Sequence, residues 1–227
     1  TPSLSLSGPS MSLVYPSSSA TPRLDPNGLY ILLSDIGGNN RFHWALYLSQ
    51  PAPSIDATES DVPYGDERAH PQTQTQTQDQ TQPRNQNPAH AQAHKGTIFH
   101  LLSDPNDDTS WTYSVLPNTP ISSLERPFLV AMKIGDIDPV LHEALAERLA
   151  QIVEDHQYYS VRFREGMTSR VWIKEAVWAL NEEGYINLVQ SGSKEVVEKI
   201  ENEAMMLAMR CSYRSEQMVL TSSWCVI

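Results

Sequence analysis

The sequence predicts a single α+β domain in which an antiparallel sheet of about five strands packs against about three helices. Segments whose apolar residues alternate or run together, as they do in strands, fill the first half of the chain. Segments with apolar residues at helical spacing fill the second half. The length of 227 residues accommodates one domain of about 150 ordered residues together with less ordered segments.

The expected domain spans residues 28–210 and is interrupted by a long insert. Residues 1–27 are rich in Ser and Pro, and residues 51–95 include a Gln- and Thr-rich low-complexity stretch. Both segments lack the large apolar side chains whose burial offsets the entropy of ordering, so we expect them to be disordered. Residues 211–227 are expected to form a C-terminal tail.

The strands are expected in apolar segments that are separated by turn residues, at 29–33, 42–48, 97–102, 111–116 and 128–134. Turns are expected where Gly, Pro, Asn and Asp cluster, at 25–28, 37–40 and 105–108. Side chains of the second strand alternate between two faces. One face carries Phe42, Trp44, Leu46 and Leu48, and the other carries His43, Ala45 and Tyr47.

Three helices are expected after the last strand. The first begins at Asp138, a favoured capping residue, with Pro139 at the first helical position and an apolar stripe over residues 141–153. The second spans residues 169–181, and the third starts after Ser193. Helices that follow strands favour the α+β class over an alternating parallel arrangement.

Composition argues against several classes of partner and site. The net charge of -11, with no cluster of Lys or Arg, disfavours binding to nucleic acid or to an anionic membrane surface. No transmembrane segment is expected, because no run of about 18 apolar residues is present. The two cysteines and the lack of a signal-peptide pattern predict a cytoplasmic protein with reduced thiols. No paired-Cys motif or phosphate-binding glycine loop occurs, so neither a metal nor a cofactor is expected.

The chain as given ends in Cys225-Val-Ile227. A prenylation box requires a cysteine fourth from the end, and Cys225 is third. We therefore expect no lipid anchor, although one further residue would complete the box.

The residues best suited to chemistry are two histidines and a hydroxyl. His43 and His100 lie on strands that become consecutive once the insert is ignored, and Ser169 starts the helix that contains Trp172. This combination would suit nucleophilic catalysis. One histidine would act as the base, the second would orient it, and the helix N-terminus would stabilise an anion. All three residues could instead have structural roles. The histidines would then be hydrogen-bonded within the sheet, and Ser169 would be the N-cap of the helix.

The sequence His43-Trp-Ala-Leu-Tyr47, followed by a strand with Phe99-His100-Leu101, resembles the lecithin:retinol acyltransferase-like group. That group is a circularly permuted branch of the NlpC-type papain-like thiol hydrolases. Its members carry a His-Trp-Ala-x-Tyr strand, a strand with a second His, and an Asn-Cys dipeptide that opens a helix and supplies the nucleophile. Uncharacterised fungal proteins of similar layout carry Asn-Cys-Arg or Asn-Cys-Val, with a Trp just inside the helix. The resemblance covers about 28–50 and 95–185, and it implies a permuted papain-like fold with His43 as base and His100 as the orienting residue.

The chain departs from this family at the nucleophile. Thr168-Ser169-Arg170 stands where the resemblance places Asn-Cys-Arg, and Trp172 matches the helix Trp. A neighbouring His and a helix N-terminus can ionise a thiol, whose ordinary pKa is about 8.5. A hydroxyl needs concerted removal of its proton and a well-aimed oxyanion hole. Arg170 is either a ligand for a carboxylate or an exposed helix residue.

Three interpretations follow. The leading one is a degenerate papain-like domain, a pseudoenzyme that acts as a binding or regulatory module for a protein or for a small acyl or amide ligand. The second is an active Ser-dependent acyltransferase or hydrolase with Ser169 as nucleophile, His43 as base and His100 as orienting residue. The third is a plain interaction domain whose partner docks on an exposed sheet edge or on the helix that bears Met205 and Met206.

Overall fold

The computed structural model describes residues 23–38, 41–51, 95–104, 107–124, 126–156, 158–190 and 192–227. Within these ranges the protein is an α+β fold with a six-stranded, mostly antiparallel sheet and three α-helices, and the predicted fold class is confirmed. The disorder expected for residues 1–22 and 52–94 concerns segments outside the described residues.

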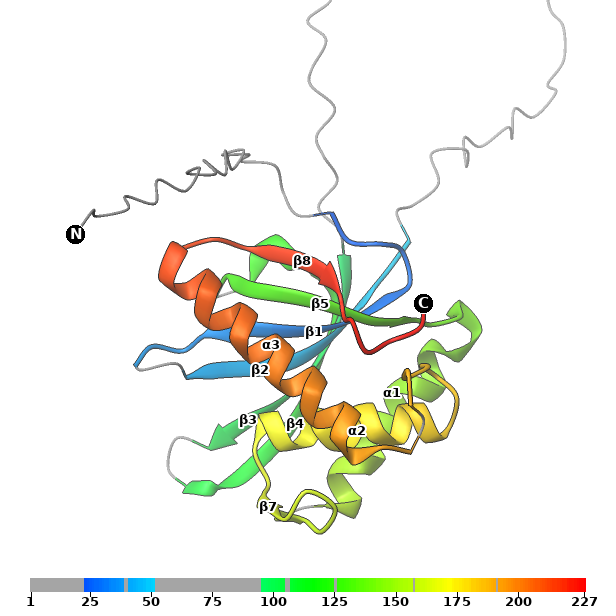
Figure 1. Ribbon diagram of the computed structural model, residues 1–227. Coiled ribbons are helices and arrows are strands. Elements are labelled where there is room, and N and C mark those ends of the chain that lie inside the picture. Colours follow the sequence, from blue (N-terminus) through cyan, green and yellow to red (C-terminus); the bar gives the residue numbers. More distant parts are fainter. Residues whose placement is uncertain are drawn as a thin grey trace, which may run out of the picture.

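The sheet is built largely from neighbouring strands that pair antiparallel (Figure 1). Its strands are β1 (Gly28–Asp35), β2 (Phe42–Ser49), β3 (Lys95–Asp104), β4 (Asp107–Pro120), β5 (Phe128–Asp136) and β8 (Met218–Thr221). The order across the sheet is β4-β3-β2-β1-β5-β8, and only β8 runs parallel to its neighbour. β1 lies in the interior of the sheet and is buried on both faces, as its continuous apolar sequence predicts.

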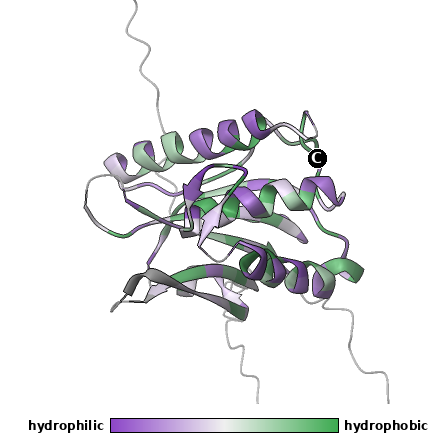
Figure 2. Ribbon diagram, turned by 90° about the horizontal axis from the view of Figure 1, so that it is seen from below, coloured by the Kyte–Doolittle hydropathy of each residue, from purple (hydrophilic) through white to green (hydrophobic). Residues whose placement is uncertain are grey.

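The three helices pack on one face of the sheet, which we call the helix face. α2 (Ser169–Glu182) packs on β2 and β3, and α3 (Lys194–Arg214) crosses β1 and β5 (Figure 1). α1 (His142–Asp155) follows a short 3-10 turn in which Asp138 accepts a hydrogen bond from the Val140 amide, so the predicted start of the first helical segment is confirmed. Hydrophilic and hydrophobic residues alternate along all three helices, as expected when one side rests on a sheet (Figure 2).

Alternation along the strands divides the apolar core into two parts. Trp44 and Leu46 point to the helix face and join the buried side chains of the three helices. Ala45 and Tyr47 point to the opposite face, which we call the far face, and belong to a smaller cluster that includes Leu24. The two predicted faces of the second strand are therefore confirmed.

The predicted N-terminal boundary is wrong for the last residues of the segment 1–27. Leu24 is only 1% exposed because it packs against the far-face cluster. Asp25 forms an ion pair with Lys133 of β5, with 2.9 Å between Oδ2 and Nζ. The boundary was missed because the Ser- and Pro-rich composition was averaged over the whole segment, which includes these two anchoring residues. The domain therefore begins earlier than expected.

The prediction of a tail over residues 211–227 is also wrong. α3 continues to Arg214 with Cys211 fully buried, and β8 then pairs with β5. β8 has four residues and pairs with a strand that lies far away in the sequence. A strand this short carries too little periodicity to be recognised, because its conformation depends on tertiary pairing.

Candidate functional site

β2 and β3 bring His43 and His100 together on the far face of the sheet. Ala45 lies opposite His100 in the antiparallel ladder, which makes His43 a diagonal neighbour of His100 on the same face. The Nε2 atom of His43 is 3.2 Å from the Nδ1 atom of His100, and the ring planes meet at 74°. The two histidines that the sequence singled out therefore form a hydrogen-bonded imidazole pair.

The surroundings favour the neutral form of both rings. Burial, together with the charges of His100 and Arg126, lowers the pKa of His43 from 6.5 to about 4. Burial also lowers the pKa of His100. Both imidazoles are therefore neutral at pH 7, and a single ring proton lies between the two facing nitrogens. A base whose pKa lies this far below neutral pH is poorly matched to general base catalysis near pH 7.

His100 leaves one polar atom without a partner. Its Nε2 atom is buried and has no hydrogen bond to any of the residues that the structure describes. Leaving a buried polar atom unpaired costs about 1–3 kcal/mol, so such atoms mark strain or a place for a further polar group. The imidazole pair thus has hydrogen-bonding capacity that its described neighbours do not use.

Ser169 occupies the first turn of α2 but does not cap it. The N-cap is Thr168, whose Oγ1 accepts a hydrogen bond from the Val171 amide at 3.2 Å. Ser169 is 8% exposed, and its side chain makes no hydrogen bond to the described part of the chain. The structural role considered for Ser169, that of N-cap, belongs to its neighbour because an N-cap residue needs extended backbone, which Thr168 has.

The sheet separates Ser169 from the imidazole pair. Trp172 of α2 is fully buried in the same core as Trp44 and Leu46, so α2 lies on the helix face. His43 and His100 alternate with helix-face residues along their strands and lie on the far face. The structure therefore brings the two histidines together and leaves the third predicted site residue on the other side of the sheet.

Trp172, which the family comparison placed in the site helix, is a core residue. It is fully buried, and its ring meets that of Tyr113 edge to face with centroids 5.8 Å apart. A small cavity nearby, lined in part by Trp44, Lys174 and Glu201, has a volume of ≈ 10 Å³. That volume holds about one water molecule, so this cavity cannot accommodate an acyl substrate.

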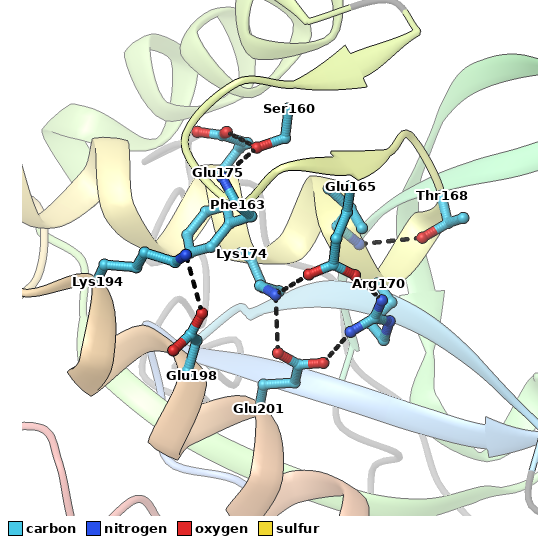
Figure 3. A network of polar contacts seen from close by, with 11 residues as sticks. Ser160, Phe163, Glu165, Thr168, Arg170, Lys174, Glu175, Lys194, Glu198 and Glu201 are labelled. Carbon is cyan, nitrogen blue, oxygen red and sulfur yellow. Dashed lines mark hydrogen bonds and ion pairs between the residues drawn. The ribbon is translucent and has the colours of Figure 1, made fainter.

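Arg170 binds carboxylates of the protein itself. Arg170 and Lys174 of α2 alternate with Glu165 and Glu201 in a closed ring of four charges, shown in Figure 3. Lys174 Nζ lies 2.6 Å from Glu165 Oε1 and 3.0 Å from Glu201 Oε2, and the Lys174 side chain is 4% exposed. Burial alone would raise the pKa of Glu165, but hydrogen bonds from Lys174 and Arg170 hold it below its ordinary value. The charge ring is balanced internally and leaves no cation free for a ligand.

No pattern in the sequence indicated this charge ring. Glu165 lies in β7 (Glu165–Gly166), which pairs with β6 (Tyr159–Ser160) in a short hairpin between α1 and α2. Glu201 comes from α3, 31 residues after Arg170. The spacing of Arg170 and Lys174 by one helical turn was visible, but their partners come from other elements and follow from the tertiary fold.

The cysteines do not supply the missing thiolate. Cys211 and Cys225 are both free, and burial raises the pKa of each, that of Cys225 to about 11. Among the described residues, no group of three or more His, Cys, Asp or Glu side chains is arranged to hold a metal ion. A membrane-spanning helix needs a long and largely apolar stretch, and none of the helices among the described residues has one.

Comparisons with known proteins leave the family open. The chain matches no protein-family model, no curated protein and no solved structure. Kinship with the lecithin:retinol acyltransferase-like group therefore stays a proposal that rests on the residues of β2, β3 and α2.

Proposed function

We propose that the chain is a binding or regulatory module derived from a papain-like acyltransferase or hydrolase, and that it performs no acyl transfer. The observation that carries this proposal is that α2, which begins at Ser169, packs on the helix face, whereas His43 and His100 lie on the far face. A nucleophile and its base have to come within hydrogen-bond reach, about 2.6–3.2 Å, or slightly more in an unliganded site.

The low pKa of His43 also argues against acyl transfer. An ordinary serine hydroxyl becomes nucleophilic only when a base removes its proton during attack. A pKa of about 4 makes His43 a weak proton acceptor at neutral pH, and no described side chain pairs with Ser169. Neither the thiolate of the resembling family nor a serine–histidine pair is supported.

The ligand of such a module belongs on the imidazole pair. Two neutral rings offer hydrogen-bond donors and acceptors without net charge, which suits an uncharged acyl or amide group better than an ion. The Nε2 atom of His100 is buried and lacks a partner among the described residues, so a ligand has to displace the side chains that cover it before it can form this hydrogen bond. We expect esters and amides of this kind to shift the NMR signals of both histidine rings without being turned over.

A thiol placed at residue 169 tests the proposal. Iodoacetamide labelling of Ser169→Cys at a series of pH values gives the pKa of the new thiol, and Ser193→Cys at the start of α3 is a matched control at another helix N-terminus. The wild-type chain gives the background from the two native cysteines. Because the imidazoles are on the other face, we expect His43→Gln to leave the titration of the new thiol unchanged.

Two results would overturn the proposal. One is a thiol in Ser169→Cys that ionises near neutral pH and loses this property when His43→Gln is added. The other is labelling of the wild type by a fluorophosphonate probe that Ser169→Ala abolishes. Either result would support the active serine enzyme.

A further inference from the structure

β4 forms one edge of the sheet and has an unpaired side. It is 14 residues long, and among the described strands it pairs with β3 alone. Residues 107–120 make no other backbone hydrogen bond to the described parts of the chain. A strand in this position presents every second N–H and C=O group outward, ready to pair with another strand.

The features that usually protect an edge are missing from the regular part of β4. Residues 109–120 contain no Lys, Arg, Asp or Glu, and the prolines at 117 and 120 lie at the C-terminal end. The ladder with β3 has no bulge between Trp111 and Leu116. Long, uncharged edges of β-branched and aromatic residues pair readily with other strands, whereas Lys, Pro and bulges prevent it. The opposite edge, β8, is protected by its length of four residues.

Apolar side chains are exposed along the same edge. Val115 is 39% exposed on the helix face of β4, and Leu116 is 42% exposed on the far face. Leu102 of β3, opposite Thr112 on the far face, is 42% exposed as well. A strand added next to β4 would remove these groups from water on both faces.

We propose that β4 pairs antiparallel with the β4 strand of a second copy of this chain, which joins two sheets into one continuous sheet. This inference is independent of the proposed function. A two-fold axis perpendicular to the sheet keeps each face on its own side, so residues pair with others of the same face. Centring the pair on Tyr113 places Trp111 opposite Val115, and centring it on Ser114 places Thr112 opposite Leu116.

The lack of charge on β4 suits a second copy of this chain as the occupant. In a two-fold pair, any charged residue near the centre lies close to its own copy, which is destabilising. The chain carries a net charge of -11, yet residues 109–120 carry none, so pairing along this edge places no charged side chain of β4 against its own copy. Aromatic residues opposite β-branched ones are favourable cross-strand pairs, and the register centred on Tyr113 provides such a pair.

Sedimentation of the full chain over about a thousandfold range of concentration tests this proposal. We expect the mass to rise from 25.4 kDa towards twice that value. Val115→Lys and Thr112→Lys should each raise the dissociation constant at least about tenfold, because each places a charge on the pairing edge. Val140→Lys, at a position 80% exposed in the turn before α1, is the matched control and should not change it.

Hydrogen exchange provides a second readout. Amides of residues 111–116 should become protected as the concentration rises in the wild type and in Val140→Lys, but not in the two edge variants. A wild type that stays monomeric throughout the range overturns the proposal and leaves the edge to a strand from another protein. A dimer that both edge variants retain, while their urea unfolding shows them to be folded, overturns it equally.

Discussion

Acidification should destabilise the protein through His43, and His43→Gln should remove much of this effect. The folded chain holds His43 neutral with a pKa of about 4, whereas the unfolded chain binds a proton below the ordinary value of 6.5. The stability that this ring contributes is therefore complete above about pH 6.5 and is lost as the pH falls towards 4. His43→Gln keeps a polar, hydrogen-bonding side chain that has no proton to gain.

The magnitude follows from the two pKa values. The interval from 6.5 to about 4, at about 1.4 kcal/mol per pH unit, corresponds to a loss of about 3 kcal/mol of unfolding free energy. About 2 kcal/mol of this is lost between about pH 7 and about pH 5. The lower pKa of His100 adds to the same trend, because burial disfavours its protonated form as well.

Urea unfolding of the wild type and of His43→Gln at about pH 7 and about pH 5 measures the effect. The difference between the two proteins should change by about 2 kcal/mol between the two pH values. Any constant cost of losing the contact with His100 cancels in this comparison. If both proteins lose the same free energy on acidification, His43 is not held neutral by its surroundings and the electrostatic part of the argument fails.

Three further changes test the packing by urea unfolding. Gly96→Ala should lower the free energy of unfolding by about 1–3 kcal/mol, because the added Cβ would lie 2.4 Å from a backbone carbonyl oxygen of β2. Gly166→Ala is the control and should be neutral, because its Cβ would have nothing within 4 Å. Equal effects of the two changes would contradict the close contact at Gly96. Lys174→Met should cost about 3–5 kcal/mol, because it leaves two partly buried carboxylates short of a partner. Lys194→Met, which removes a more exposed ion pair with Glu198, should cost less than about 1 kcal/mol. A neutral Lys174→Met would show that the charge ring contributes nothing. Leu24→Ala should cost about 2–5 kcal/mol, and no change in stability would mean that residues 23–27 are not part of the domain.

Local patterns were sufficient for most of the fold. All five predicted strands and all three predicted helices are present, because their periodicities reflect faces that are in fact buried. β8 and the hairpin of β6 and β7 were missed, since each is too short for a periodicity to register. Their existence depends on contacts with distant parts of the chain, as does the charge ring around Lys174.

The candidate site was predictable in part. His43 and His100 were expected on neighbouring strands, and the structure brings the two rings within hydrogen-bond distance. The alternation along β2 already placed Trp44 and His43 on opposite faces, and helices cover the face with the larger apolar side chains. The separation of Ser169 from His43 was therefore implicit in the pattern, whereas the family resemblance pointed to an approach between them.

The pairing of β2 with β3 has a consequence for how this chain tolerates change. The amide of Gln50 donates to the carbonyl oxygen of Lys95 at 2.9 Å, so the two ends of the intervening sequence are fixed side by side by the sheet itself. The entropy of closing a loop grows only with the logarithm of its length, and each doubling costs about 0.6 kcal/mol. A change in the number of residues that join these two ends is thus expected to cost the domain little stability, as long as the ladder of β2 and β3 holds the ends together.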